Sequence, residues 1–327
     1  MKSAKFGQHR SVYNKSISLV GILAAMAWMA LANTSCSVKE IDTEHYYLCI
    51  GISDYENVKK LTYPNIDAEG LAYTLSQRGW QNAIPENASS PWKDGKLLDR
   101  NATKANIKDA IEKGFADVPS DATVLVYFSG HGAYNASKKI SYLVPCEYPA
   151  RQNFSAAISP EELYSWFSGL PTKNIIFISD SCYSGGFVST QDSGDAMPDS
   201  YQDGADSTSV SVPNYALANF GSLLAKNAQA VGGRAPIAIS AAGAKESSYD
   251  GFPDKAHGVL TYYLLLAADM GDSNHDGYVT CTEAYSYTAR CINNYWNDKY
   301  GKEMAFYPHI SGGARDLVLY CKSQDGG

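Results

Sequence analysis

The stretch ATVLVYFSGHG, residues 122–132, joins an apolar run to a histidine that lies between two glycines. A second stretch, NIIFISDSCYSGG at residues 174–186, has the same form, with a cysteine in place of the histidine. Runs that are apolar at consecutive positions are typical of strands buried on both faces of a parallel sheet. Because ligand sites form at the carboxyl ends of such strands, we expect His131 and Cys182 to lie at the same sheet edge.

The rest of the chain alternates apolar runs with segments of helical apolar spacing. The further strands that we expect are residues 46–52, 140–144, 237–240 and 317–320. The expected helices are residues 67–80, 103–115 with Thr103 as N-cap, 160–167 with Ser159 as N-cap, 259–269 and 282–296. This alternation predicts an α/β fold, an αβα sandwich with a mainly parallel sheet.

The N-terminal 35 residues have the pattern of a secretory signal. Residues 1–16 hold four basic residues and no acid, and residues 17–32 are uncharged and apolar. The apolar run is shorter than the ~20 residues of a comfortable membrane span. Small residues before Cys36 resemble a bacterial lipoprotein cleavage site, so we expect lipidation at Cys36 and an exported, membrane-anchored lipoprotein, periplasmic or at the cell surface. The alternatives are simple secretion and an uncleaved membrane anchor.

Removal of residues 1–35 takes away four positive charges and no negative ones, which changes the net charge from −7 to −11. An acidic chain repels nucleic acid, so we expect no such partner, and membrane association through the N-terminal lipid only. We divide the rest into a linker at 36–45, one domain at 46–321 and a tail at 322–327. Residues 188–233, rich in Ser, Asp and Gly over 190–212, predict a long mobile loop within the domain.

Cys182 and His131 are candidates for a nucleophile and its base. A thiol needs a base or a positive environment to become a thiolate near neutral pH, and an imidazole supplies both. The glycines around each residue allow close approach of a substrate. Taken singly, each residue has an ordinary alternative, because a lone cysteine after a strand is usually a buried small residue and a lone histidine in a loop is usually solvated.

The segments YFSGHG (127–132) and DSCYSGG (180–186) resemble the two signature segments of metacaspases and of their bacterial caspase-like relatives. The order of the other pieces along the chain also matches the family: GISDY and NIDAEGLAYTL come before the two segments, and ISAAG and HGVLTYYLL come after them. The resemblance implies a caspase–haemoglobinase-like fold and a cysteine endopeptidase that hydrolyses polypeptides through a Cys182/His131 dyad. Metacaspases often require calcium at a group of aspartates, but the matching stretch here, residues 155–165, lacks an Asp pair, so we expect no cofactor for catalysis. It also implies an oxyanion hole of backbone amides near Gly132 and Cys182.

The residues that match the metacaspase substrate pocket are Asp67, Ser129 and Asp180. Two carboxylates in a small pocket would pair with a guanidinium or ammonium group, so we expect cleavage after Arg or Lys. The alternatives are that Asp67 is the N-cap of the helix it begins and that Asp180 only orients loop amides.

Residues 272–283, DSNHDGYVTCTE, match the twelve-residue EF-hand loop. Asp272, Asn274, Asp276 and Glu283 would supply side-chain oxygens to calcium, and Tyr278 its carbonyl. The alternative is a polar turn with Glu283 in the first turn of the next helix.

Caspase-like enzymes are often activated by cleavage between the catalytic strand and the next strand. Lys226 and Arg234 lie late in that segment and are candidate self-cleavage sites, although both could be ordinary surface charges.

Two other functions stay open beside the basic-specific endopeptidase. One is a catalytically silent binding or scaffold protein, against which the intact Cys182 and His131 argue. The other is a related peptidase with Asp preference, or with ligase activity from the same thioester.

Overall fold

A computed structural model describes residues 43–85, 87–135, 137–183, 216–241, 255–301, 305–313 and 316–321. The predicted signal, Cys36 and most of the predicted linker lie outside these residues, as does 190–212, the center of the predicted loop. Within the described ranges, no helix is both long and apolar enough to span a membrane.

The core of the fold is an eight-stranded sheet. Its main order is β2–β1–β4–β6–β7–β9, with β3 and β5 pairing to β1 and β4. The bounds are β1 His45–Gly51, β2 Gln81–Asn82, β3 Lys96–Leu98, β4 Thr123–Asn135, β5 Ile140–Leu143, β6 Asn174–Tyr183, β7 Ile237–Ser240 and β9 His309–Ser311. Among the described strands of this sheet, β5 and β9 pair antiparallel and the other pairings are parallel, which confirms the predicted mainly parallel sheet.

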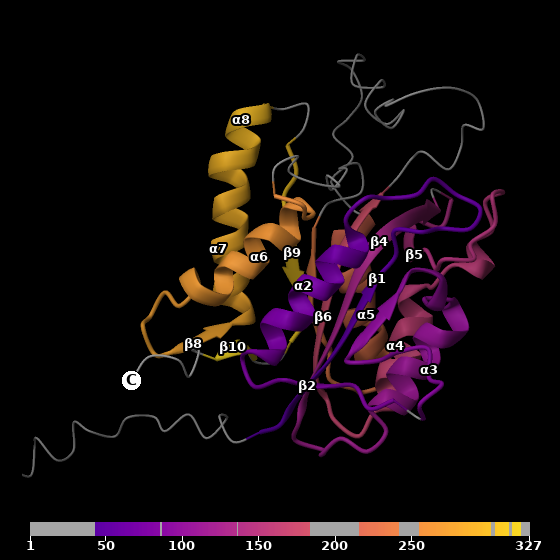
Figure 1. Cartoon of the computed structure of the whole chain (residues 1–327), viewed down its shortest axis with the longest axis horizontal. Coiled ribbons are helices and arrows are strands. Elements are labelled where there is room, and N and C mark those ends of the chain that lie inside the picture. The colour runs from indigo at the N-terminus through magenta and orange to yellow at the C-terminus, as the bar shows by residue number, and fades with distance from the viewer. Residues whose placement is uncertain are drawn as a thin grey trace, which may run out of the picture. The chain divides into compact units, whose positions relative to one another are not determined.

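Helices cover both faces of the sheet, as the αβα prediction required (Figure 1). One face carries α3 (Lys104–Gly114), α4 (Pro160–Ser168) and α5 (Ala216–Ala230). The other carries α2 (Pro64–Ser76), α6 (Val259–Met270) and α7 (Cys281–Cys291). Short helical segments are η1 Asp99–Asn101, η2 Phe154–Ala156, the π-helix η5 Ile292–Asn297 and α8 Asp298–Tyr300.

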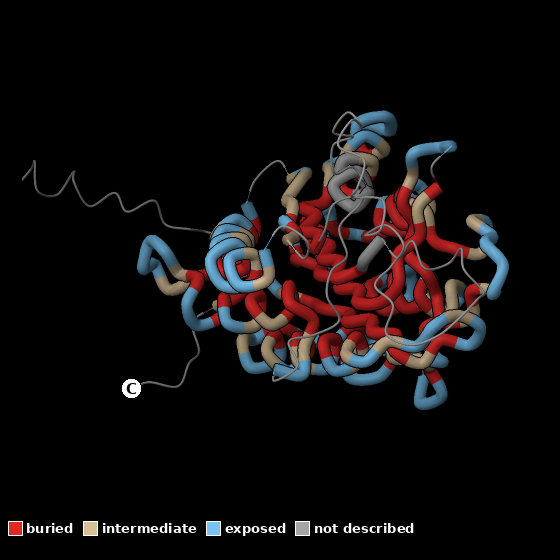
Figure 2. Tube along the Cα trace, turned by 90° about the horizontal axis from the view of Figure 1, so that it is seen from above, coloured by how far each residue is buried: buried red, intermediate tan, exposed pale blue. Residues whose placement is uncertain are grey.

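The strands explain why the sheet needs two helical layers. Along β4, Val124, Val126 and Phe128 pack in the core beneath α3 and α4, whereas Leu125 and Tyr127 pack beneath α2 and α6. Side chains of a strand alternate between its faces, so an unbroken apolar run buries both. In Figure 2 the buried residues accordingly fill the inside of the sandwich.

The helix starts follow the capping residues. Thr103 accepts a hydrogen bond from the Asn106 backbone nitrogen, and Ser159 forms a capping box with Glu162, so both predicted N-caps are confirmed. The helix predicted from residue 67 instead begins at Pro64, because proline is well suited to a first helical turn.

Two predicted boundaries were wrong. β4 and β6 do not end before the SGHG and DSCY motifs but run through them, because β5 extends the ladder beyond Phe128. The predicted loop 188–233 contains helix α5, whose Leu224 and Ala228 are four residues apart and buried. The predicted last strand is present as β10 (Val318–Cys321), and it pairs with β8 (Tyr278–Thr280) outside the main sheet.

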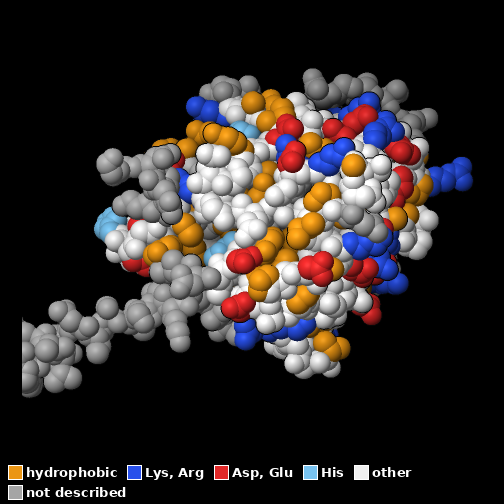
Figure 3. Space-filling view, turned by 60° about the horizontal axis from the view of Figure 1, so that its bottom comes forward, with side chains coloured by type: hydrophobic (Ala, Val, Ile, Leu, Met, Phe, Trp, Pro, Cys, Tyr) orange, Lys and Arg blue, Asp and Glu red, His pale blue; other side chains and the backbone are white. Residues whose placement is uncertain are grey.

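Charges of both signs are interspersed on the surface shown in Figure 3. Ion pairs along α3 are an example, with Lys113 Nζ 3.0 Å from Asp109 one turn earlier. Such exposed pairs stabilise a helix by only a few tenths of a kcal/mol, about 0.3–0.5.

Candidate active site

His131 and Cys182 are register partners in the parallel strands β4 and β6. Two residues earlier, Ser129 and Asp180 are partners in the same ladder. Neighbouring strands lie about 4.8 Å apart, so the backbones of the two motifs are adjacent at one sheet edge. The structure describes the backbone of Cys182, and it brings the two predicted dyad residues together.

The imidazole of His131 is buried and oriented by a backbone carbonyl. Its Nε2 lies 2.7 Å from the Lys59 carbonyl oxygen. A carbonyl can only accept, so Nε2 carries the hydrogen and the lone pair of the neutral ring is on Nδ1. The residue is 7% exposed, and burial lowers the pKa of His131 to about 4. The ring is therefore neutral near pH 7, as a general base must be.

The loop that supplies the Lys59 carbonyl is itself held in place. Asp99 Oδ1 accepts hydrogen bonds from the backbone nitrogens of Ser53 at 2.8 Å and Asp54 at 2.9 Å. Arg100 Nε pairs with Asp54 Oδ2 at 2.7 Å. Asp99 has a φ of 48°, a left-handed conformation that Asp adopts more readily than most residues. These contacts fix the segment whose carbonyl orients the His131 ring.

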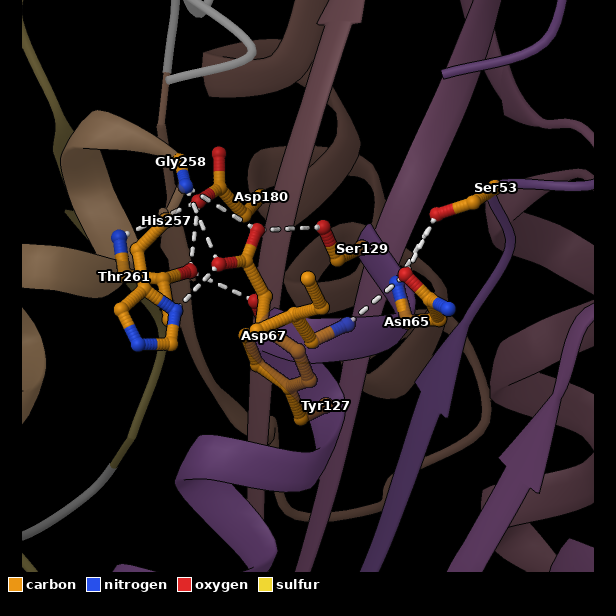
Figure 4. Close-up of polar contacts among 10 residues, drawn as sticks. Ser53, Asn65, Asp67, Tyr127, Ser129, Asp180, His257, Gly258 and Thr261 are labelled. Atoms are coloured by element: carbon orange, nitrogen blue, oxygen red, sulfur yellow. Dashed lines mark hydrogen bonds and ion pairs between the residues drawn. The ribbon is translucent and has the colours of Figure 1, made fainter. Parts of the chain in front are cut away.

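The three predicted pocket residues also come together (Figure 4). Asp67 and Asp180 are 1% and 5% exposed, and the buried Ser129 donates a hydrogen bond to Asp67 Oδ2 at 3.2 Å. Asp67 projects from α2, whereas Ser129 and Asp180 are side by side in β4 and β6. The predicted acidic cluster therefore exists.

Both carboxylates accept hydrogen bonds from the start of α6. The Gly258 nitrogen donates to Asp67 Oδ1 at 3.0 Å, and the Thr261 nitrogen and hydroxyl donate to Asp180 Oδ2 at 3.1 and 2.6 Å. Helix N-termini stabilise negative charge, so the two acids anchor α6 as well as lining the edge of the sheet. Tyr127 extends this chain, with its hydroxyl 2.6 Å from Thr261 Oγ1.

The alternative reading of Asp67 as an N-cap of its own helix was wrong. The N-cap of α2 is Tyr63, and Asp67 lies in the first turn with its carboxylate directed at α6. Burial raises the pKa of the Asp67 carboxyl, and hydrogen bonds from His257, Gly258 and Ser129 oppose this rise.

Gly258 lies close to both carboxylates. A Cβ on Gly258 would stand 2.8 Å from Asp180 Oδ2 and 2.9 Å from Asp67 Oδ2. Any side chain there would collide with both acids, so the start of α6 requires glycine at this position.

Sequence reasoning missed four residues of this site: Tyr55, Lys59, His257 and Thr261. His257 Nδ1 lies 2.9 Å from Asp67 Oδ1, and the Tyr55 hydroxyl lies 2.7 Å from the His131 backbone nitrogen. The segment HGVLTYYLL contains His257 and Thr261 and resembled the family. The contact of His257 with Asp67 joins residues 190 positions apart, so no pattern in the neighbouring sequence indicated it.

The predicted oxyanion residue Gly132 lies within the ladder, with Leu143 of β5 on one side and Tyr183 of β6 on the other. Its role in an oxyanion hole stays a prediction.

The predicted calcium loop has part of the expected geometry. Asp272 accepts from the backbone nitrogens of Asp276 and Gly277, and Gly277 has a φ of 91°. Glu283, however, forms the capping box of α7 with Thr280, as the turn alternative described. Across the described residues, no three His, Cys, Asp or Glu side chains are gathered to hold a metal ion.

The two candidate cleavage sites differ in accessibility. Lys226 lies inside α5, where the backbone is helical. Arg234 is exposed in the turn before β7, and its Nη1 lies 2.8 Å from Oδ1 of Asn174, the first residue of β6. Cys182 is eight residues further along β6, about 26 Å at 3.3 Å per residue. Arg234 is therefore at the opposite edge of the sheet.

The other described cysteines are free and unsuited to nucleophilic chemistry. Cys49, Cys146, Cys281 and Cys291 are buried, and Cys321 is half-buried. Burial raises the pKa of the Cys49, Cys146, Cys281 and Cys321 thiols. A thiolate is the reactive form, so these thiols are poor competitors for an alkylating reagent.

The chain is similar to a known protein family and to solved structures. The family model described as the caspase domain matches residues 45–286. Caspase-1 from Spodoptera frugiperda aligns at 14% identity and a TM-score of 0.50, over 87% of this chain and 91% of that chain. Protein GSU0716 from Geobacter sulfurreducens aligns at 18% identity and a TM-score of 0.49, over 83% and 95%. None of the curated proteins compared with the chain matches it.

Proposed function

Because the chain belongs to the caspase-domain family and has its αβα sandwich, we propose that it is a cysteine endopeptidase with Cys182 as nucleophile and His131 as general base. The observation that carries the proposal is the register pairing of these two residues in neighbouring parallel strands. The neutral, buried imidazole with Nε2 held by the Lys59 carbonyl leaves Nδ1 as the proton acceptor.

In the proposed reaction, His131 Nδ1 takes the proton of the Cys182 thiol, and the sulfur attacks the scissile carbonyl carbon. The tetrahedral intermediate collapses as the carbon–nitrogen bond breaks, and His131 returns the proton to the leaving amine. Water, activated by the same imidazole, then hydrolyses the thioester and releases the thiol. Backbone amides near Gly132 and Cys182 would hold the oxyanion.

For the substrate we propose Arg or Lys before the cleaved bond. Asp67 and Asp180 are two buried carboxylates at the sheet edge next to the dyad, and the imidazole of His257 pairs with Asp67. Two buried carboxylates side by side attract positive charge, and a guanidinium or ammonium group would form charge-assisted hydrogen bonds with them. An acidic substrate side chain would instead add a third negative charge.

We propose that self-cleavage occurs after Arg234 and that one molecule cleaves another. Peptidases bind extended chains, so the helical Lys226 is a poor site. Arg234 contacts the N-terminal end of β6, and Cys182 is near the C-terminal end of the same strand. Arg234 therefore cannot reach Cys182 of its own molecule unless β7 unfolds.

Two further properties are proposals from the sequence. We propose that Cys36 carries the lipid that anchors the exported protein. We also propose calcium at residues 272–283, where Asp272, Asn274, Asp276, Glu283 and the Tyr278 carbonyl would be the ligands and Glu283 would turn away from Thr280 to bind.

The test uses residues 37–327 with fluorogenic peptides that end in Arg, Lys or Asp. We expect turnover of the Arg and Lys peptides, none in Cys182→Ala, and loss of the basic preference in Asp67→Asn. Turnover of the Asp peptide alone would contradict the acidic pocket. Absence of turnover, with Cys182 no more reactive than a free thiol toward iodoacetamide, would favour the binding-protein alternative.

A further inference from the structure

His257 occupies a position beside the acidic cluster that no part of the proposed reaction uses. Its Nδ1 lies 2.9 Å from Asp67 Oδ1, and its side chain is 20% exposed while that of Asp67 is 2% exposed. The imidazole lies beside the carboxylate (Figure 4) and is the more exposed of the two groups. An Nδ1–H donates to the carboxylate whether or not the ring is charged.

Two features of the backbone next to this ring are unusual. A Cβ on Gly70 of α2 would stand 2.9 Å from His257 Cε1, so the ring fits against α2 only because residue 70 has no side chain. Glycine inside a helix costs ~1 kcal/mol relative to alanine. Ala256, directly before His257, has a φ of 55°, an uncommon conformation for a residue with a side chain. The glycine inside α2 and the positive φ of Ala256 both disfavour the folded chain, and both lie next to the contact between His257 and Asp67.

The ring is not needed to anchor α6. The Gly258 nitrogen already donates to Asp67, and the Thr261 nitrogen and hydroxyl already donate to Asp180. What the imidazole adds is a third donor to Asp67, whose pKa burial raises. A protonated carboxyl does not attract a cation, so the charge of Asp67 depends on its donors.

We propose that His257 is a specificity-positioning residue: through Nδ1 it keeps the Asp67 carboxylate ionised and oriented, so that the pocket selects a basic side chain. This inference rests on the proposed basic preference. It assigns His257 a role in recognition and none in the proton transfers of Cys182 and His131.

The test measures inactivation of Cys182 in the purified protein by peptidyl chloromethyl ketones with Arg or Ala next to the reactive group. The Arg/Ala ratio of inactivation rates measures how strongly the pocket prefers a basic side chain. The rate with iodoacetamide, which has no such side chain, measures the intrinsic reactivity of Cys182 beside His131. We expect His257→Leu to lower the ratio about tenfold at a similar iodoacetamide rate. His257→Asn, whose amide nitrogen can replace Nδ1, should stay within about threefold of wild type.

Gly70→Ala is a second, independent variant. Its methyl group displaces the ring while favouring the helix, so the ratio should fall in a protein that is no less stable. It also keeps the test open if His257→Leu does not fold.

If the wild-type ratio is high and stays high in His257→Leu, the role of His257 is overturned while the basic preference stands. The same conclusion follows if the ratio falls equally in His257→Leu and His257→Asn. A wild-type ratio near one overturns the basic preference together with the inference.

Discussion

The Tyr55 hydroxyl accepts a hydrogen bond from the His131 backbone nitrogen at 2.7 Å and donates one to the Val144 carbonyl at 3.1 Å. The two rings also contact, with centroids 4.7 Å apart. One buried hydroxyl thus ties β4, the strand of His131, to the segment that follows β5. Tyr55 fixes the backbone of His131, and the Lys59 carbonyl fixes its ring.

Tyr55→Phe should therefore reduce both stability and reactivity. It leaves the buried His131 N–H without its acceptor, which costs about 1–3 kcal/mol in the free energy of unfolding. Tyr320→Phe is the matched control, because that buried hydroxyl donates to the Leu264 carbonyl, away from β4. Urea unfolding should show losses in both variants. The iodoacetamide rate of Cys182 should fall only in Tyr55→Phe, and an equal rate in both would refute the positioning role.

Burial of His131 predicts a loss of stability in acid. The pKa of about 4 in the folded protein lies below the ordinary value of 6.5, so the unfolded chain binds the proton first. The contribution is constant above pH 6.5 and is lost as the pH falls from 6.5 to 4, by about 3 kcal/mol in total. His131→Gln lacks this titration, so its unfolding free energy should fall less over the same range. Parallel curves for the two proteins would instead indicate a solvated imidazole.

The part of the fold that the sequence predicted is the part with local signals. The unbroken apolar runs identified the strands that form the center of the sheet, and Thr103 and Ser159 marked helix starts. The strands β2, β3 and β9 have two or three residues each and carry no periodicity that could be recognised. Helix α5 was missed because it borders a Ser- and Asp-rich segment that dominated the composition.

The candidate site divides in the same way. His131 and Cys182 could be named because each motif is contiguous in sequence. Their pairing followed from strand order, which a parallel α/β sheet makes predictable. His257, Tyr55 and Lys59 act through contacts across 190, 76 and 72 residues, and only the folded chain brings those partners together.

Gly258→Ala should destabilise the protein through the acidic cluster. The added Cβ would approach oxygens of Asp67 and Asp180 to within 3 Å, and overpacking of this kind costs about 1–3 kcal/mol. Gly169→Ala is the control, because its Cβ would meet nothing closer than 3.6 Å and its φ of −78° suits alanine. Melting temperatures should fall for Gly258→Ala alone. A fall in Gly169→Ala of the same size would remove the argument from the carboxylates.

Glu283 gives the calcium proposal its sharpest test. Its carboxylate accepts from the Thr280 nitrogen at 3.0 Å and from the Ser273 hydroxyl at 2.8 Å, and a bound ion would compete for the same oxygens. Glutamine can serve in a capping box but cannot bind calcium bidentately. Glu283→Gln should therefore match wild type in melting temperature in chelator.

Added calcium should raise the melting temperature of the wild type, because a ligand that binds only the folded state stabilises it. It should raise that of Glu283→Gln much less. Magnesium at the same concentration is the control, since it prefers a smaller octahedral site with retained waters. A wild-type melting temperature that is the same in calcium and in chelator would show that residues 272–283 form a polar turn, with Asp272 bonded to the loop backbone and Glu283 capping α7.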